Sequence, residues 1–576
     1  WTYWWEYNRT AFLARRGEPV TGPRTGSDDF YLGVRSARVG DRDFAPSAAD
    51  LEQRVLPALR AALESGSSRD VATACMIALA KVGRDHREFA LFDLLAPRLA
   101  SGYQEERETA ALALGLAGID GPRELGLLIA LAADGDAGSI ACGREHVDDR
   151  TRAFAAYGLG LMAQGSARLQ TRFRIAAALC DLVGDPQTDR DVVVAAIHGL
   201  GLCRPTTARP GERALLDAAL ARLEQRFVGG GRATDAIAIA HCPTAIARLV
   251  GIEGDRAEHF RASFAGVLAG GVRPAHSAHD PARSAALALG ALCGPTARDR
   301  SCVDVLSETV HAHRDHQTRY FAILALGQIG GADNRVTLLR EFDRANVLER
   351  PWCALALGVL EHARFARCRA EGTSPEPDRL VGETLLAAHR DSRNPDLRAA
   401  LAVALGLCRY TPAATALGEA LRDSLHRPEL AGYHCIGLAL LRDPSALPIL
   451  RAVLAESERR PELMRQAATA LAHLGDSAAA VPLLELLQNG APSVTRLAAI
   501  ASALGVVGDR RAIGPLLEIL ADDGRPRLCA AFAAAALGGV CDKDDVPWNG
   551  RIAAGINYRA AVDTLVGAGC GILDIL

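Results

Sequence analysis

The sequence predicts an all-α fold: a solenoid, or α-α superhelix, of about a dozen helical hairpins stacked side by side. One segment type recurs along most of the chain, and each copy joins a Leu-striped helix to an Ala-rich helix that has almost no polar face. The chain has 576 residues, whereas a single compact core usually stops growing near roughly 250–300 residues. An elongated repeat array accounts for the length, the repeat and the composition together.

The recurring segment begins with an arginine and continues as a run of Ala and Leu that ends in Leu-Gly or an equivalent pair. Successive glycines of this kind lie 31 to 48 residues apart, and one interval of 89 residues leaves room for two copies. A degenerate copy at 234–250 and an early copy at 75–83 bring the total to about thirteen. The clearest copies are 107–115, 152–160, 283–290, 319–327, 350–358, 398–406 and 465–475.

Each copy follows another apolar helix, which is clearest at 478–490 and 511–524. Leucines at i, i+3 and i+4 give that helix one apolar stripe, and Gly, Asp and Asn behind it favour a turn. The Ala-rich helix is apolar all round, so its partner and both neighbouring repeats must cover it. A helical glycine costs about 1 kcal/mol relative to alanine, so its recurrence predicts a close contact between helices.

Five arginines lie eight residues before the glycine of their copy, near the start of the Ala-rich helix. We expect each to bond a turn carbonyl or an aspartate of the next repeat, with a row of anion sites as the alternative. Exposed ion pairs of this kind contribute only about 0.2–1 kcal/mol each. The five are Arg107, Arg152, Arg319, Arg350 and Arg398.

Charge and cysteine usage exclude several classes of protein. The 65 basic and 68 acidic residues give a net charge of −3, which disfavours a general nucleic-acid binder. The 14 cysteines are scattered without any C-x-x-C pair, so zinc and redox motifs are disfavoured and buried free thiols are expected. No apolar run reaches about 18 residues, so no membrane span is predicted.

These residues resemble HEAT repeats of the phycobilisome-lyase-like type, in which a short turn, an arginine and an A-A-x-A-L-G run define the second helix. The resemblance covers roughly residues 70–540 and implies a HEAT/armadillo-like fold. The ends, WTYWWEYNRTAFL (1–13), SDDFYLG (27–33) and INYRAAVDTLVGAGCGILDIL (556–576), resemble a bacterial subgroup with a WxxWWExN start and no assigned activity.

The resulting domain prediction has four parts. Residues 1–13 form an aromatic capping helix, 14–46 a loop or linker, 47–545 the solenoid, and 546–576 a C-terminal cap. A solenoid needs such caps over its end repeats. Three of the five tryptophans, Trp1, Trp4 and Trp5, lie in the first segment, so a partner-docking patch is the alternative for that segment.

No catalytic signature is present. The two lysines, Lys81 and Lys543, do not stand in a P-loop, and G-x-G-x-x-G, G-x-S-x-G and H-E-x-x-H are missing. HEAT-fold di-iron hydroxylases use paired His-Glu steps, and this sequence has no His-Glu dipeptide. We therefore expect a protein that is not an enzyme, and we assign no catalytic residue, cofactor or metal ligand.

One histidine pattern recurs in the turns before Ala-rich helices, in AHSAHD (275–280) and HAHRDH (311–316). The offset of 37 that aligns Gly290 with Gly327 also aligns the histidines, and an offset of 130 aligns an earlier turn. The pattern fits solvated turn side chains, a ridge that contacts a partner, or a metal site if the turns lean together. The partner-binding candidates are His146, Asp149, His276, His279, His313 and His316.

The function that these patterns favour is a binding or scaffold protein that presents an extended solenoid surface to a macromolecular partner, most simply a protein. The first alternative is a metal-dependent or lyase-like modifying enzyme at the histidine ridge, and the second is a nucleic-acid-binding HEAT solenoid. The family resemblance implies an exported or periplasmic protein. Lone cysteines suit a reducing compartment, so the cytoplasm is the alternative.

Overall fold

The computed structural model describes residues 1–13, 44–66, 68–203, 210–228, 236–270, 279–476, 478–488, 492–567 and 569–575. These residues separate into two compact units. Unit 1 comprises Trp1–Arg9, Gly83–Tyr410 and Pro547–Leu576, and unit 2 comprises Thr10–Val82 and Thr411–Val546. Most of the expected linker and the SDDFYLG segment lie outside the described residues.

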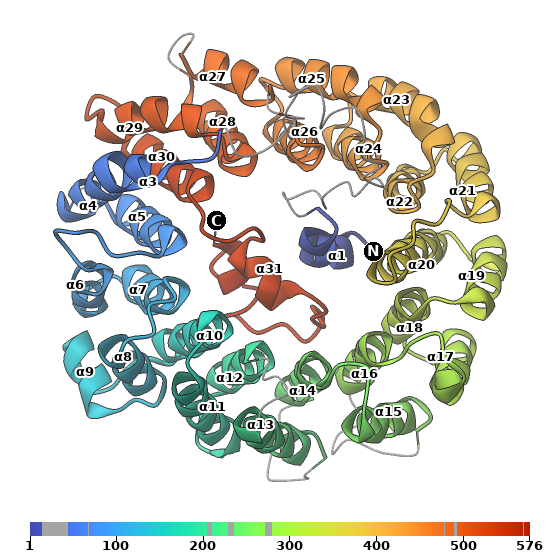
Figure 1. The fold of residues 1–576 in the computed structure, drawn as a ribbon, viewed down its shortest axis with the longest axis horizontal. Helices are drawn as coiled ribbons and strands as arrows, with labels where there is room; N and C mark the ends of the chain where they lie inside the picture. Colours follow the sequence, from blue (N-terminus) through green and yellow to red (C-terminus); the bar gives the residue numbers. More distant parts are fainter. Residues whose placement is uncertain are drawn as a thin grey trace, which may run out of the picture. The chain divides into compact units, whose positions relative to one another are not determined.

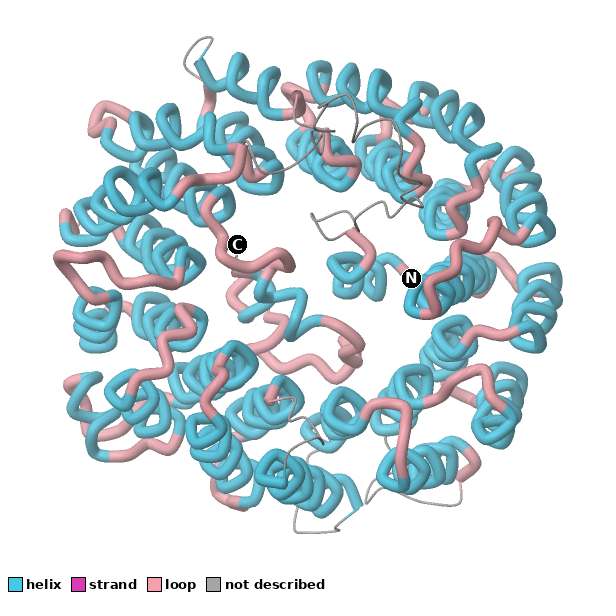
Figure 2. Tube along the Cα trace, viewed as in Figure 1, coloured by secondary structure: helices cyan, strands magenta, loops and turns pink. Residues whose placement is uncertain are grey.

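The predicted all-α fold is confirmed. The described residues form helices joined by turns, without a strand, and Figure 2 shows helix and loop throughout. Within the described ranges, eight helical hairpins belong to unit 1 and five to unit 2, in agreement with the repeat count from the sequence.

In unit 1 the Ala-rich helices pack side by side in one row, and the Leu-striped helices form a second row (Figure 1). The Ala-rich row is α7 (Gln104–Leu116), α10 (Asp149–Gly165), α12 (Arg190–Leu202), α14 (Ala236–Val250), α16 (His279–Leu292), α18 (His316–Ile329), α20 (Arg350–Ala370) and α22 (Pro395–Leu407). The other row is α6 (Leu91–Leu95), α8 (Pro122–Ala132), α9 (Asp136–Cys142), α11 (Leu169–Gly184), α13 (Pro210–Val228), α15 (Asp255–Leu268), α17 (Arg300–Ala312), α19 (Ala332–Arg344) and α21 (Arg379–Asp391).

Unit 2 repeats the two-row arrangement. Its Ala-rich helices are α5 (Arg69–Val82), α24 (Pro428–Leu440), α26 (Pro461–His473), α28 (Val494–Val507) and α30 (Arg527–Val540). Its other helices are α3 (Ala48–Asp50), α4 (Leu56–Glu64), α23 (Ala414–Asp423), α25 (Leu447–Glu456), α27 (Ala480–Gln488) and α29 (Ile513–Ala521). Within this unit α5 packs on α30, so its first and last hairpins are neighbours.

The recurring glycines lie where neighbouring Ala-rich helices touch, as the sequence predicts. A Cβ on Gly160 would come 2.5 Å from the Cα of Gly199 in the next helix, and one on Gly358 would come 2.7 Å from the Cα of Ala404. Real Cβ atoms do not approach a backbone so closely, so only glycine permits this helix spacing. The close contact offsets the cost of a glycine inside a helix.

Three of the five recurring arginines, Arg107, Arg152 and Arg319, donate to carbonyls at helix ends or turns, as expected. The guanidinium of Arg107 donates to the carbonyl of Ser101 at 3.0 Å and pairs with Asp148 of the next repeat at 3.3 Å. Arg319 donates to the carbonyl of Val310 at 2.8 Å and pairs with Glu349 at 3.0 Å. These arginines link successive hairpins.

Two short helices lie outside the two rows: α1 (Thr2–Asn8) and α31 (Trp548–Ala553). Both belong to unit 1 and contact each other, on the side of its Ala-rich row (Figure 1). The segments expected as caps therefore meet each other in unit 1. No single described helix has both the length and the hydropathy to cross a membrane, and one bent pair, α8 with α9, passes that test by length and composition only.

Candidate functional site

We call the six partner-binding candidates from the sequence the histidine ridge, and those in the described residues lie near the starts of Ala-rich helices in unit 1. His279 and His316 are exposed first residues of α16 and α18, and His313 follows α17. The ring centroids of His279 and His313 are 6.3 Å apart, and the Nδ1 atom of His313 accepts a hydrogen bond from the backbone N–H of Asp315 at 3.1 Å. His276 lies outside the described residues.

The remaining ridge residues lie on an earlier turn. His146 is exposed and its Nδ1 atom is 3.1 Å from a carboxylate oxygen of Asp134. Asp149, the first residue of α10, pairs with Arg152 at 3.0 Å. Among the described residues, no three His, Cys, Asp or Glu side chains form a group that could hold a metal ion. A role of the ridge in partner binding remains a prediction.

Three charged residues, Asp280, Arg283 and Asp315, join α16 to the turn before α18, and we call them the clamp. Arg283 donates two hydrogen bonds of 2.8 Å to the carboxylate of Asp315, and a third of 2.8 Å to Asp280. Burial would raise the pKa of Asp315, but the hydrogen bonds from Arg283 and Thr318 outweigh it and hold that pKa far below its ordinary value. The clamp fixes the spacing of the two turns that carry His279 and His313.

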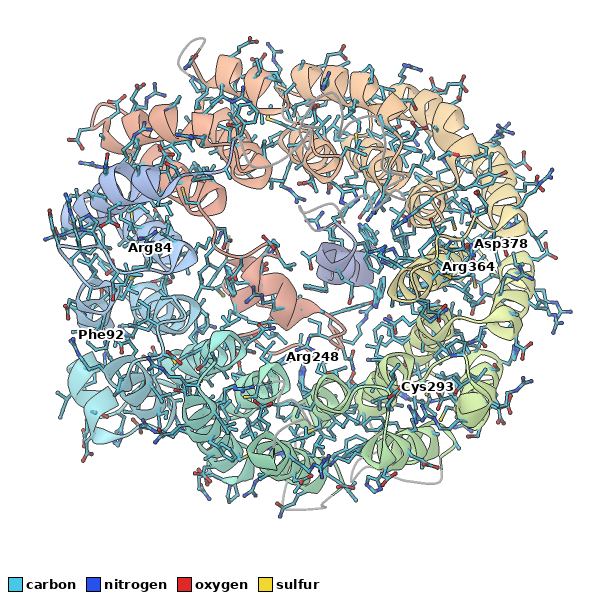
Figure 3. The ribbon with its side chains drawn as sticks, in the orientation of Figure 1. Arg84, Phe92, Arg248, Cys293, Arg364 and Asp378 are labelled. Carbon is cyan, nitrogen blue, oxygen red and sulfur yellow. The ribbon has the colours of Figure 1, made fainter. Side chains whose placement is uncertain are left out.

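The described residues of the C-terminal segment, 552–567 and 569–570, bind along the Ala-rich row of unit 1. Five successive helices of the row, from α10 to α18, each contribute polar contacts to it, and most of these reach its main chain. Arg248 of α14, labelled in Figure 3, donates to the carbonyls of Ile552 (2.8 Å) and Ala554. Arg150 donates to the carbonyl of Cys570, the carboxylate of Asp191 accepts from the N–H of Thr564, and His241 contacts the carbonyl of Ala560. The side-chain amide of Asn557 donates to the hydroxyl of Ser284 and to the carbonyl of Asp280, and that of Gln317 donates to the hydroxyl of Tyr558.

The two ends of the chain meet in unit 1. The side-chain oxygen of Asn8 in α1 accepts a hydrogen bond from the N–H of Gly555 at 2.8 Å. Tyr3 stacks on Tyr558 with ring centroids 5.7 Å apart, and Phe321 of α18 meets the same ring edge-on at 5.5 Å. Aromatic pairs of this geometry add about 0.5–1.5 kcal/mol beyond their buried area, so the two ends hold each other on α18.

We call Tyr3, Gln317, Tyr558 and Arg559 the terminal patch. The amide of Gln317 donates to the hydroxyl of Tyr558 at 3.1 Å and accepts from the guanidinium of Arg559 at 3.3 Å. Burial raises the pKa of Tyr558 to about 12, so its hydroxyl stays protonated. Tyr3 is 64% exposed.

Arg559 carries the uncompensated charge of the terminal patch. It is exposed, and no described carboxylate forms an ion pair with it. Asp280 in α16 and Asp315 before α18 are bound to Arg283 instead. The patch therefore offers an exposed aromatic ring beside a guanidinium that has no described carboxylate partner, a combination suited to a ligand that has both apolar surface and an anionic group.

A buried histidine pair lies beneath the C-terminal segment. The Nε2 atom of His198 is 3.0 Å from Nδ1 of His241, whose Nε2 atom is 2.8 Å from the carbonyl oxygen of Ala560. Both side chains are at most 2% exposed. Burial lowers the pKa of His198 well below its ordinary value, and repulsion from His241 and Arg248 adds to that effect. The neutral His198 thus supports His241, which tethers the segment to α14.

Sequence reasoning found His279, His313 and His316 but missed the terminal patch. Gln317 directly follows His316, and Tyr558 and Arg559 lie in the resemblance motif INYR. No periodic signal connects these positions, because a contact between residues 317 and 558 depends on how the chain closes back on itself. The tryptophan-rich segment 1–13, for which a partner-docking patch was the alternative prediction, was the one local feature that indicated the terminal patch.

The comparisons with known proteins agree on repeats and assign no function. A family model for HEAT repeats matches residues 425–503. No curated protein matches the chain.

Several solved structures share a likeness of fold. Importin beta, crystallised in a polyethylene glycol condition, is 16% identical with a TM-score of 0.33, over 84% of this chain and 71% of that chain. Kap121p bound to Nup53p is 14% identical with a TM-score of 0.34, over 92% and 56%. Human deoxyhypusine hydroxylase in complex with glycerol is 18% identical with a TM-score of 0.21, over 66% and 95%. At TM-scores below 0.5 these likenesses support no functional inference.

Proposed function

We propose that this chain is a non-catalytic binding protein that holds a polypeptide partner on the Ala-rich side of unit 1, with the terminal patch as the contact. The observation that carries the proposal is Tyr3: 64% exposed, stacked on Tyr558, in a patch whose Arg559 has no described carboxylate partner. Tyrosine and arginine dominate the binding energy of known protein interfaces. An exposed tyrosine on a fixed aromatic support is preorganised for such a contact.

The C-terminal segment supports the same proposal, because it is itself a polypeptide that lies on this surface. Arg150, Arg248 and His241 each bind main-chain carbonyls of this turn-rich segment, so recognition there depends little on side-chain identity. The terminal patch adds the selective element, a guanidinium that requires a carboxylate. The expected partner is a polypeptide with an acidic residue beside an apolar one.

A peptide-display selection on the full chain tests this proposal. We expect enriched peptides to contain Asp or Glu, and to bind with at least tenfold lower affinity when Tyr3→Ala or Arg559→Gln is introduced. Tyr103→Ala and Arg379→Gln are matched controls, because both side chains are exposed and lie outside the terminal patch. Fluorescence anisotropy with labelled peptides measures the affinities.

Two outcomes would overturn the proposal: peptides without acidic residues, or peptides whose affinity falls equally with the patch and the control substitutions. Circular dichroism of each variant confirms that its helices are intact. No described contact favours the metal-dependent or nucleic-acid alternative, so no second function is proposed.

A further inference from the structure

A polar pocket of about 230 Å³ lies between two successive hairpins of unit 1, α17–α18 and α19–α20. Its charged side chains are Arg319, Glu341, Arg344 and Glu349, with His311 at the mouth. Val310, Ile323 and Cys353 supply apolar wall. Burial raises the pKa of the Cys353 thiol, so the thiol stays protonated and adds no charge to the pocket.

Two of the four charges neutralise each other. Arg319 pairs with Glu349 at 3.0 Å and also donates to the carbonyl of Val310 at 2.8 Å. Both partners of this pair are largely buried, with 25% and 13% of their side chains exposed. This pair therefore adds no net charge to the pocket.

The other two charges remain open. The carboxylate of Glu341 is 14% exposed, and the only described cationic side chain within 4 Å of it is His311, whose Nε2 atom is 3.8 Å away, beyond hydrogen-bond distance. Arg344 is exposed and forms no ion pair among the described residues, although it lies three positions after Glu341 on α19. A half-buried carboxylate without a hydrogen bond is costly unless a donor reaches it.

We infer that this pocket binds a small aliphatic α-amino acid. The ligand should bring one positive group for Glu341 and one negative group for Arg344, because the Arg319–Glu349 pair is already neutral. The ends of α17 and α19 also face the pocket through Val310 and Ala345, and helix C-termini favour an ammonium group. Drug-sized ligands occupy pockets of about 300–1,000 Å³, so this volume suits a smaller molecule whose side chain meets Val310 and Ile323.

The test uses the full chain and three probes of one shape: L-valine, isobutylamine (valine without its carboxylate) and isovalerate (valine without its ammonium). Isothermal titration calorimetry should show saturable binding of L-valine, with each analogue at least tenfold weaker. Glu341→Gln should abolish the preference for valine over isovalerate. Arg344→Gln should abolish the preference for valine over isobutylamine.

Glu383→Gln is the matched control, because Glu383 is an exposed glutamate on the neighbouring α21 and lies outside the pocket; it should leave binding unchanged. The comparison of the three probes on the unaltered chain stands even if a variant folds poorly. The inference is overturned if L-valine shows no saturable binding at millimolar concentration, or if isobutylamine or isovalerate binds equally well. Such a result would leave the polypeptide-binding proposal untouched, because no residue is shared.

Discussion

Gly538 of α30 lies directly against Ala78 of α5, although 460 residues separate them: a Cβ added to Gly538 would come 2.7 Å from the Cα of Ala78. The backbone of Lys543 extends this contact by donating to the carbonyl of Lys81 at 3.0 Å. The apolar flank of the first hairpin in unit 2 is therefore covered by the last hairpin of the same unit. An apolar helix cannot remain stable with such a flank in water.

The first prediction concerns this glycine. Gly538→Ala should destabilise unit 2 by about 1–2 kcal/mol, because the added methyl group overlaps the α5 backbone and forces the helices apart. Gly126→Ala is the control: Gly126 is inside α8 with no atom within 4 Å of an added Cβ, so alanine should stabilise by up to about 1 kcal/mol. Thermal unfolding followed by circular dichroism measures both changes in stability. If both substitutions stabilise, or both destabilise, the close contact at Gly538 is contradicted.

The second prediction concerns the buried histidines. Burial depresses the pKa of His198 in the folded state and lowers that of His389 to about 4. At a pH below 6.5, the ordinary pKa of histidine, the unfolded chain therefore binds more protons than the folded chain. Stability should therefore fall as pH drops from 7 toward 5, by up to about 1.4 kcal/mol per pH unit for each group.

Urea unfolding at several pH values checks this slope. His198→Gln should make the slope shallower by close to one proton. A slope that does not change with His198→Gln would show that the buried pair is not the source of the pH dependence.

The third prediction concerns the clamp between α16 and α18. Arg283→Gln should destabilise unit 1 by about 1.5–3 kcal/mol, because it removes charge-assisted hydrogen bonds to Asp315 and Asp280. Asp315→Ala should cost more than Asp315→Asn, since alanine also removes the N-cap hydrogen bond to Thr318. Denaturant unfolding compares the variants with Arg379→Gln, an exposed i,i+4 pair that should matter little.

The fourth prediction concerns the cysteines. All 14 are free, 11 are buried, Cys180 and Cys368 are intermediate, and Cys570 is exposed. Brief alkylation of the native chain should label Cys570 first, and the buried thiols should react only after denaturation, because a reagent cannot reach them. Mass spectrometry of peptides identifies the labelled positions. Early labelling of Cys408 or Cys435, both 0% exposed, would contradict the packing.

Local patterns account for the parts of this fold that were predicted. The arginine, the Ala-rich run and the glycine of each copy recur because every hairpin meets the same surroundings, so periodicity alone predicts the two rows of helices. The close approach at Gly160 and Gly358 follows from the same reasoning, and so does the burial of most cysteines. The ridge histidines were located by register for the same reason.

Contacts between distant segments left no such pattern. His241 binds the carbonyl of Ala560 across 319 residues, and Gln317 binds Tyr558 across 241. Every residue has the same main-chain carbonyl, so the amino-acid sequence does not distinguish Ala560 as a hydrogen-bond acceptor. The open charges of Glu341 and Arg344 were also hidden, because charged residues on a Leu-striped helix resemble an ordinary solvated face.

The sequence by itself determined the helical hairpins, their stacking through small residues and the positions of their turns, because these depend on side-chain periodicity over a few dozen residues. Only the tertiary structure decided that the C-terminal segment lies along α10 to α18, that Tyr3 meets Tyr558, and that α5 packs on α30. These contacts depend on where the curvature of each stack carries distant segments, and that curvature is the sum of many small helix-to-helix rotations that no single residue encodes.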